Sequence, residues 1–406
     1  MIWEKLPGES IFDRIVKIGY ILKTISKTGS SMAKVEQRCF LLEIFWLTLL
    51  LTGCQMQGGL VKSAIAKPDY TIILDDLNEP RGLWQRADGS LCVAETGYKV
   101  EMTLPDAGPI TLPPGTGSLT CVDANGKRER VVEGLPYAHY GASGVSVGPT
   151  DVAELDGALY LLTAEGDDQL SRSLLRIEHS KPPQIVANFL YFATAGQPLE
   201  YFLPGEITSN PYAMLPDPAN RRFLVTDGAT GQLLAVGLDG QIQLYSSVEG
   251  HEVLTGMTWG PDGLPYVTSF SQLPHQAGAG AVLSIANGVA HVVLTGLTTP
   301  IDLAFDQAGR LYVLEFVYAG ETGDPYRNKT GRLVRFLPQG DQWDTGQLLI
   351  EGLPYPTALL INANDQLYIS INGAFSPPGS GAVVSFSNLT QQQGGEPPIQ
   401  YGAMNE

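Results

Sequence analysis

Cysteine and histidine are scarce in this sequence of 406 residues, which contains four cysteines and five histidines. No two of them stand at the short spacing of a zinc site, so the sequence predicts neither a zinc finger nor a zinc ribbon. The histidines are spread over different parts of the chain. We expect each of them to be a loop or surface residue rather than a catalyst.

Basic side chains are also few, since 25 Lys and Arg stand against 42 Asp and Glu, a net charge of −17. The first 53 residues hold 7 of the basic and 5 of the acidic side chains, so the rest of the chain has 18 and 37 and a net charge of −19. Such a surface repels nucleic acid and anionic membranes. We therefore expect a small molecule or a protein as the partner.

Amphipathic helical patterns are missing from residues 70 to 390, where a different pattern recurs six times. Each unit opens with a short motif, continues with a tight turn and a short β-run, and adds another β-run that usually starts at glycine. The openings lie at 77–83, 148–153, 210–213, 256–259, 299–304 and 355–359. Repetition of such a unit is typical of a β-propeller. The sequence predicts an all-β fold, a six-bladed β-propeller with four-stranded antiparallel blades.

The last unit, from Pro356 to Phe386, shows only three β-runs. Residues 70–75 have the form of an outer strand but precede the first opening. A propeller whose first and last blades do not join would leave strand edges exposed. We therefore expect residues 70–75 to supply the fourth strand of the last blade and to pair with the strand near residues 383–386.

Residues 1–53 lie outside the repeats and are predicted to form an N-terminal extension with a signal segment. Lys34 and Arg38 precede an apolar run that ends in Leu-Thr-Gly-Cys, similar to the lipobox of bacterial lipoproteins. Cys54 is then the lipidation site, and the protein is expected on the periplasmic side of the cell envelope, held to the membrane by its lipid. Glu43 interrupts the run, and an uncleaved anchor or a buried segment are the alternatives.

The start of translation is left open between Met1 and Met32. Residues 54–69 are predicted to be a linker, residues 70–390 the propeller, and residues 391–406 a flexible tail.

Cys92 and Cys121 fall on the second and third β-runs of the first unit, which are adjacent strands in an antiparallel blade. An oxidising periplasm would allow a disulfide between them. The interpretation favoured here is two small buried side chains without a bond.

One face of the propeller is predicted to bind a ligand, because the long loops all emerge beside the starts of the inner strands. These loops cover residues 98–116, 270–279, 316–330 and 372–380, whereas the turns on the other face are short. The candidate ligand residues of this face are Arg81, Asp151, Asn210, Tyr212 and Asn372.

Acidic residues recur near the same face, at the ends of second strands and the starts of inner strands. A ring of carboxylates near the axis would suit Ca²⁺, the one cofactor considered. An acidic residue at a strand end also commonly accepts backbone N–H bonds and shapes its own turn, and this alternative is preferred. The metal candidates are Glu95, Glu165, Asp227, Asp302 and Glu315.

The chain resembles the ScyD/ScyE family of secreted NHL-type propellers, first associated with scytonemin pigment gene clusters in cyanobacteria. The resemblance is carried by residues 78–83 with 93–97, 148–152, 210–212, and 301–306 with 311–315. It implies a binding propeller beside a secondary-metabolite pathway, and it brings no catalytic residues. The lipobox, in place of an ordinary secretory signal, and Pro265 depart from the family pattern.

More distantly, the architecture is similar to calcium-dependent six-bladed lactonases and gluconolactonases. Two functions therefore compete: a non-enzymatic propeller that binds a ligand or a protein, which we prefer, and a metal-dependent hydrolase.

Overall fold

The computed structural model describes residues 70–100, 115–140, 144–166, 168–193, 209–272, 275–318, 330–340, 342–386, 389–392 and 398–400. All of them belong to one compact unit, Lys67–Glu406. The predicted signal segment, Cys54 and the linker lie outside the described residues. Within the described part, no helix has the length and apolar character needed to cross a membrane.

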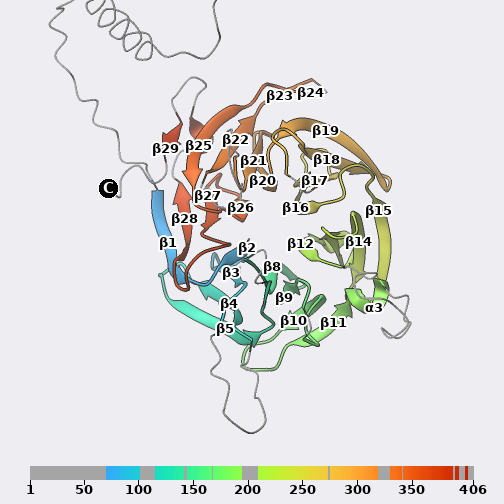
Figure 1. Cartoon of the computed structure of the whole chain (residues 1–406), viewed down its shortest axis with the longest axis vertical. Coiled ribbons are helices and arrows are strands. Elements are labelled where there is room, and N and C mark those ends of the chain that lie inside the picture. The colour runs from blue at the N-terminus through green and yellow to red at the C-terminus, as the bar shows by residue number, and fades with distance from the viewer. Residues whose placement is uncertain are drawn as a thin grey trace, which may run out of the picture. The chain divides into compact units, whose positions relative to one another are not determined.

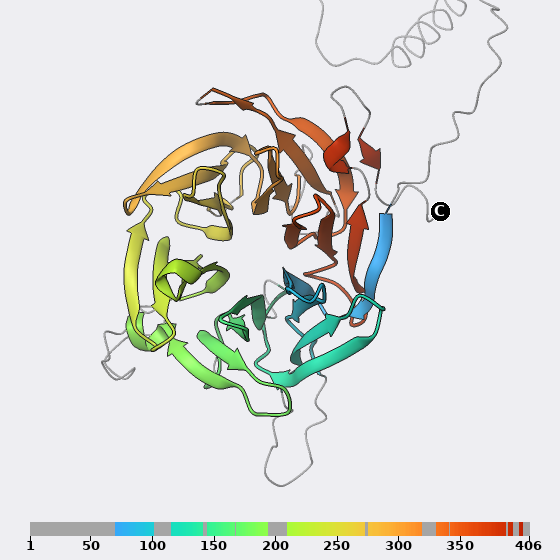
Figure 2. The same ribbon diagram turned by 180° about the vertical axis from the view of Figure 1, so that it is seen from behind.

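Six antiparallel sheets are arranged around a central axis (Figures 1 and 2). Blade 1 contains β2 (Pro80–Gln85), β3 (Leu91–Glu95), β4 (Gly117–Val122) and β5 (Arg128–Leu135), and blade 2 contains β8 (Pro149–Leu155), β9 (Ala158–Thr163), β10 (Ser173–Ile177) and β11 (Gln184–Asn188). Blade 3 contains β12 (Pro211–Asp217), β13 (Arg222–Asp227), β14 (Gln232–Gly237) and β15 (Ile242–Ser247), and blade 4 contains β16 (Leu254–Trp259), β17 (Pro265–Ser269), β18 (Gly280–Ala286) and β19 (Val289–Leu297).

Blade 5 contains β20 (Pro300–Phe305), β21 (Leu311–Glu315), β22 (Gly331–Phe336) and β25 (Gln347–Leu353), and blade 6 contains β26 (Ala358–Ile361), β27 (Leu367–Ile371), β28 (Gly381–Phe386) and β1 (Tyr70–Leu77). In every blade, the strand named first above is the innermost one. Strand β1 comes first in the chain but is the outer strand of blade 6. The predicted six-bladed propeller is confirmed.

The middle strands of the blades are largely buried, and β3 and β4 are buried along their whole length. Both faces of a blade pack on its neighbours, so these strands contain continuous apolar runs rather than an alternating pattern. Between blades 2 and 3, for example, the rings of Tyr160 and Phe223 lie 5.0 Å apart. The hydrophobic core is therefore divided into layers between blades.

The ring is closed by the two ends of the propeller, as predicted. Strand β1 pairs antiparallel with β28, and Tyr70 stands opposite Phe386. Blades 6 and 1 are also joined near the axis, where the Thr357 hydroxyl donates to the carbonyl of Pro80 over 2.6 Å. Without β1, blade 6 would have three strands and the edge of β28 would be exposed.

The prediction of a flexible tail from residue 391 is wrong for residues 399–400. Strand β29 (Ile399–Gln400) pairs in parallel with β25 and adds a fifth strand to blade 5. A two-residue strand carries too little pattern to be recognised in a sequence.

Several short elements lie outside the six blades. They are the hairpins β6 (Ala138–Tyr140) with β7 (Val145–Val147) and β23 (Pro338–Gln339) with β24 (Gln342–Trp343), the helix α3 (Phe189–Ala193), and the 3₁₀ turns at Pro218–Asn220 and Leu389–Gln391.

Candidate functional site

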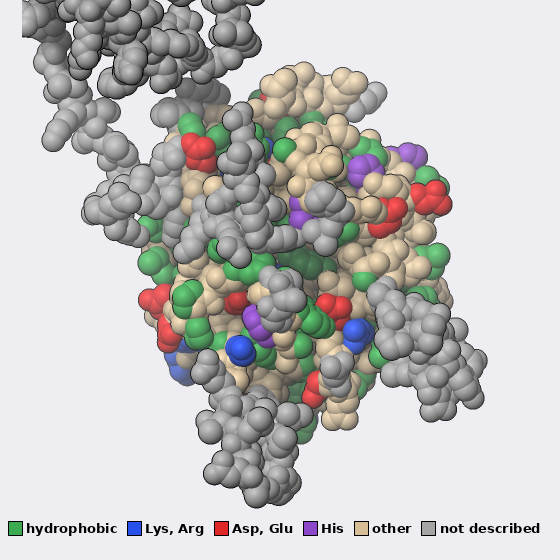
Figure 3. Space-filling model, in the orientation of Figure 1, with side chains coloured by type: hydrophobic (Ala, Val, Ile, Leu, Met, Phe, Trp, Pro, Cys, Tyr) green, Lys and Arg blue, Asp and Glu red, His purple; other side chains and the backbone are tan. Residues whose placement is uncertain are grey.

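A cavity of about 410 Å³ opens on the long-loop face, at the end of the central channel. We call it the mouth cavity. Figure 3 views the face of Figure 1 and shows hydrophobic side chains in the hollow near its centre. The described residues that line it come from inner-strand starts and from the long loops, and they include Arg81, Asn210, Tyr212, Val253, Phe270, Ser271, His275, Ile301, Phe316, Ala374 and Phe375.

Aromatic rings from three blades form the wall of this cavity. The ring of Phe316 lies 5.9 Å from that of Phe270 and 6.4 Å from that of Phe375, centroid to centroid. Tyr355 supports the group from behind, 5.6 Å from Phe316. Tilted rings at such distances attract one another and offer a large apolar surface. The wall suits the face of a flat, apolar molecule.

The backbone at this wall is held in uncommon conformations. Phe375 has φ of 53° and Ser271 has φ of 92°, a region that residues other than glycine rarely adopt. Strained residues of this kind gather at binding sites, because the surrounding structure must hold them in place. The backbone conformation of the loop ends that carry the aromatic wall is therefore determined by the surrounding fold rather than by the local preference of these residues.

Two polar side chains stand out in the mouth cavity. The Arg81 Nε donates to the Thr96 hydroxyl over 3.0 Å, and its Nη2 donates to the carbonyl of Ser146 over 3.3 Å. The Tyr212 hydroxyl is buried without a partner at hydrogen-bond geometry among the described residues. Burial raises the pKa of Tyr212, and the nearby Arg81 guanidinium opposes that rise. Tyr212 thus stays a neutral phenol.

Below the mouth cavity lies the central channel, a space of about 140 Å³ surrounded by residues of all six inner strands. Tyr212 lines both spaces. Asp151 of β8 and Asp302 of β20 are the two acidic residues among the described residues of the channel wall. They sit deep inside the molecule, yet each is partly accessible from the channel.

Both channel carboxyl groups connect two blades. Asp151 accepts the N–H of Val152 over 2.8 Å and the N–H of Met214, in blade 3, over 2.7 Å. Burial raises the pKa of Asp151 to about 8 against these hydrogen bonds, and the charge of Asp302 adds to the rise. Burial likewise raises the pKa of Asp302 to about 7. Carboxyl groups that titrate near neutrality can donate or accept a proton there.

Three of the five predicted metal candidates accept a backbone hydrogen bond from their own blade. Glu95, Asp227 and Glu315 are buried, and each accepts the N–H of a residue 17 positions earlier, just before the inner strand of its own blade. These donors are Asn78, Asn210 and Thr298. The recurrence supports the turn-forming alternative, because the same hydrogen bond ties the second strand to the start of the first in three blades.

Arginines occupy further oxygen atoms of two of these carboxylates. Arg130 Nη2 lies 3.2 Å from Glu95, and Arg332 pairs with Glu315. Burial still raises the pKa of Glu315, against the effect of Arg332. Glu165 lies beyond the end of β9 and is partly exposed. In the described part of the chain, no three His, Cys, Asp or Glu side chains gather closely enough to hold a metal ion.

The predicted ligand residues are divided between three places. Arg81, Asn210 and Tyr212 line the mouth cavity, whereas Asp151 lies in the channel. Asn372 lines neither space; its Nδ2 donates to the carbonyl of Ser380 and closes the 372–380 loop. The aromatic wall was not among the predicted site residues. Its signal was an aromatic residue directly after the second strand in blades 4 and 5, Phe270 after Ser269 and Phe316 after Glu315.

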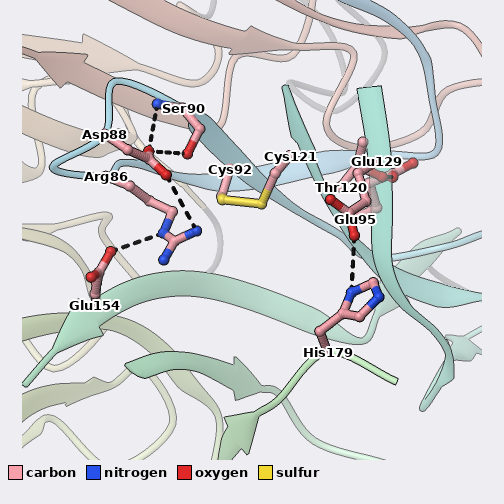
Figure 4. Close-up of a disulfide and its surroundings, with 10 residues drawn as sticks. All are labelled: Arg86, Asp88, Ser90, Cys92, Glu95, Thr120, Cys121, Glu129, Glu154 and His179. Atoms are coloured by element: carbon pink, nitrogen blue, oxygen red, sulfur yellow. Dashed lines mark hydrogen bonds and ion pairs between the residues drawn. A yellow bond between two sulfur atoms is a disulfide. The ribbon is translucent and has the colours of Figure 1, made fainter. Parts of the chain in front are cut away.

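The opposite face bears a groove of about 600 Å³ between blades 1 and 2, which is lined by basic and acidic side chains and by Cys121. Here the prediction about the cysteines is wrong. Cys92 and Cys121 form a disulfide, with the sulfur atoms 2.05 Å apart, as Figure 4 shows. The two residues are direct partners in the β3–β4 register, so their side chains point to the same face of the sheet.

Comparisons with known proteins bear on the fold. A Thermus thermophilus protein assigned as an oxidoreductase (glucose dehydrogenase) superimposes with a TM-score of 0.52 and 14% identity, over 78% of this chain and 98% of that one. A further glucose dehydrogenase gives a TM-score of 0.50 and 13% identity, over 78% and 99%. A gluconolactonase from Xanthomonas campestris superimposes with a TM-score of 0.47 and 12% identity, over 80% of this chain and 92% of that one.

These solved structures share 12 to 14% identity with this chain. Identities this low show the fold alone. No family model matches the sequence, and no curated protein matches it. The resemblance to the ScyD/ScyE family stays a prediction.

Proposed function

We propose that this protein is a binding propeller of the cell envelope, which holds a small, flat and largely apolar ligand in the mouth cavity. The aromatic wall of Phe270, Phe316 and Phe375 around a space of about 410 Å³ carries this proposal. Ligand sites in proteins are concave, mostly apolar and roughly 300 to 1,000 Å³ in volume, with a few polar groups that orient the ligand. A role beside a secondary-metabolite pathway, which the family resemblance implies, belongs to the same proposal.

A direct test uses 2-naphthamide as a neutral, flat probe and isothermal titration calorimetry on the full chain. We expect saturable binding to one site, weakened roughly threefold to tenfold by Phe375→Ala, since an aromatic pair contributes about 0.5 to 1.5 kcal/mol beyond its buried area. Leu244→Ala is the matched control, because Leu244 is an exposed apolar residue on the outer strand β15. Equal loss in both variants, or no binding at all, contradicts the proposal.

The location forms a separate part of the proposal. The apolar run before Cys54 and the Leu-Thr-Gly-Cys sequence support lipidation of that cysteine on the periplasmic side. Cys54→Ala should release or mislocalise the protein and should remove the lipid mass from the peptide that contains residue 54. A variant that stays in the membrane with the mass otherwise unchanged argues for an uncleaved anchor.

A hydrolase or lactonase is the second candidate function, and the Asp151 and Asp302 pair favours it. Their raised pKa values would let one carboxyl act as a general base and the other as a general acid near neutral pH. An assay of δ-gluconolactone opening tests this candidate. We expect activity, if this function holds, to fall at least a hundredfold in Asp302→Asn, in line with the usual contribution of general acid–base catalysis.

A further inference from the structure

We propose that the ligand of the mouth cavity is a planar aromatic molecule with an anionic group, such as a carboxylate, and that Arg81 binds this group. The inference rests on the proposed binding function and adds the chemical class of the ligand. Among the described residues that line the cavity, Arg81 is the one permanent cation, and the others are apolar or neutral.

The guanidinium of Arg81 is held by two hydrogen bonds and has further N–H donors that these bonds do not use. Its Nε and Nη2 donate to Thr96 and Ser146, which hold the plane of the group in position. Arginine has five N–H donors, so these two bonds leave capacity for a further acceptor. A fixed guanidinium that faces a cavity is well suited to bind a carboxylate through two parallel hydrogen bonds.

The charge of Arg81 has no salt-bridge partner among the described residues, although Glu79 lies near enough to act on it electrostatically. Arg81 forms no ion pair with any residue that the structure describes, whereas most other arginines of the described blades pair with carboxylates. Among these are Arg86, Arg130, Arg222, Arg310 and Arg332. Arg128, Arg172 and Arg335 bond neutral oxygen atoms instead, but none of them lines the mouth cavity. Arg81 thus combines a charge that forms no salt bridge in the described part of the chain with access to a cavity.

Glu79 is a carboxyl group near Arg81, and it does not change this conclusion. It is almost completely buried, and its Oε2 has no partner among the described residues. Burial raises the pKa of Glu79 more than Arg81 lowers it, so the environment disfavours the charged form. Glu79 is not among the described residues that line the mouth cavity, so a ligand carboxylate in the cavity can still reach Arg81, which does line it.

His275 is the other basic side chain on the cavity wall, and it is in contact with Phe270, ring edge to face. Burial lowers the pKa of His275, so this imidazole is neutral at pH 7 and does not compete for an anion. The net charge of −17 repels anions at long range, but salt screens that repulsion beyond about 8 Å at physiological ionic strength. Recognition therefore depends on the local contact with Arg81.

The test compares 2-naphthoate with 2-naphthamide, which have the same ring system and differ in charge, by calorimetry on the full chain. We expect the wild-type protein to bind the naphthoate at least tenfold more tightly than the amide. Arg81→Gln should abolish this preference, and Arg81→Lys should keep part of it. Arg86→Gln is the matched control, because Arg86 lines the groove of the opposite face, and it should leave the preference unchanged.

Each outcome is decisive. Amide binding as tight as naphthoate binding overturns the anionic ligand and leaves the binding function standing. Failure of both probes removes the proposed function as well. A preference that survives in Arg81→Gln overturns the role of Arg81. Since the wild-type comparison needs no variant, it decides the ligand class even if Arg81→Gln does not fold.

Discussion

Asp151 and Asp302 occupy equivalent positions on inner strands that lie across the channel from each other, three blades apart. Asp302 accepts the N–H of Leu303 over 2.8 Å and the N–H of Leu359, in blade 6, over 2.7 Å, which repeats the bonds of Asp151 to blades 2 and 3. In each case a glycine of the preceding blade, Gly82 or Gly256, approaches the carboxylate so closely that a Cβ would overlap it. Blades 1 to 3 and blades 4 to 6 therefore build the channel in the same way.

The raised pKa values of this pair predict that stability falls as the pH rises from about 4 to about 8. The folded pKa values of about 8 and 7 exceed the value near 4 of an unfolded aspartate, so the folded state binds more protons between about pH 4 and 8. The free energy of unfolding must then fall as pH rises through this window. Each pKa unit corresponds to about 1.4 kcal/mol.

Urea unfolding at about pH 5.5 and about pH 8.5 measures the effect. We expect a flatter pH dependence in Asp302→Asn than in the wild type, although the variant loses one backbone hydrogen bond and is less stable throughout. Parallel pH profiles of the two proteins contradict the raised pKa values.

The disulfide should stabilise the propeller. Cys92 and Cys121 are 29 residues apart, and closing a loop of that length removes unfolded-state entropy equivalent to about 3 to 4 kcal/mol. Reductant should therefore lower the urea midpoint of the wild type, while the double variant Cys92→Ala and Cys121→Ala should not respond to it. Peptide mapping without reductant should recover the two cysteines in one linked pair of peptides. Free thiols at both positions in protein purified without reductant would show that the bond does not form.

Removal of β1 should open the ring. A chain that starts at residue 67 keeps β1 and should unfold cooperatively, because residue 67 begins the compact unit. A chain that starts at residue 79 lacks the strand that pairs with β28 and exposes its edge. We expect a lower melting temperature and aggregation of the shorter chain in light scattering. Similar melting curves for the two chains contradict closure by β1.

Glu315 should matter for stability and Glu165 should not. Glu315→Gln leaves Arg332 without its buried partner and weakens the bond to Thr298, a change that costs about 3 to 5 kcal/mol in comparable buried pairs. Glu165→Gln is the matched control at a partly exposed position and should change the free energy of unfolding by less than about 0.5 kcal/mol. Equal effects in urea unfolding would argue against the turn-forming role.

Calcium provides an independent check on the same carboxylates. A cation at Glu95, Asp227 or Glu315 would have to compete with backbone N–H groups that already bind them. We expect differential scanning fluorimetry to give the same melting temperature in excess calcium and in chelator. A rise with calcium that Glu315→Gln abolishes would instead support the calcium site predicted from the sequence.

The sequence by itself was sufficient to predict the six blades, their four-stranded composition and the closure by residues 70–75. These features depend on local signals: turn residues that demand a positive φ, such as Gly89 and Gly263, and short β-runs between them. Each unit repeats those signals, so an ambiguous unit is supported by its neighbours. The long-loop face followed from the same pattern, because the order of strands decides where the loops emerge.

Register and side-chain direction were decided only by the tertiary structure. A shift of one residue between β3 and β4 would turn Cys92 and Cys121 to opposite faces, and adjacent strands alone did not reveal their bond. The sequence pattern predicts that Glu315 and Asp302 both lie near the long-loop face. Yet Glu315 binds its own blade, while Asp302 faces the channel. The aromatic wall depends in the same way on loops from blades 4, 5 and 6, since contacts between distant units leave no periodic trace in a sequence.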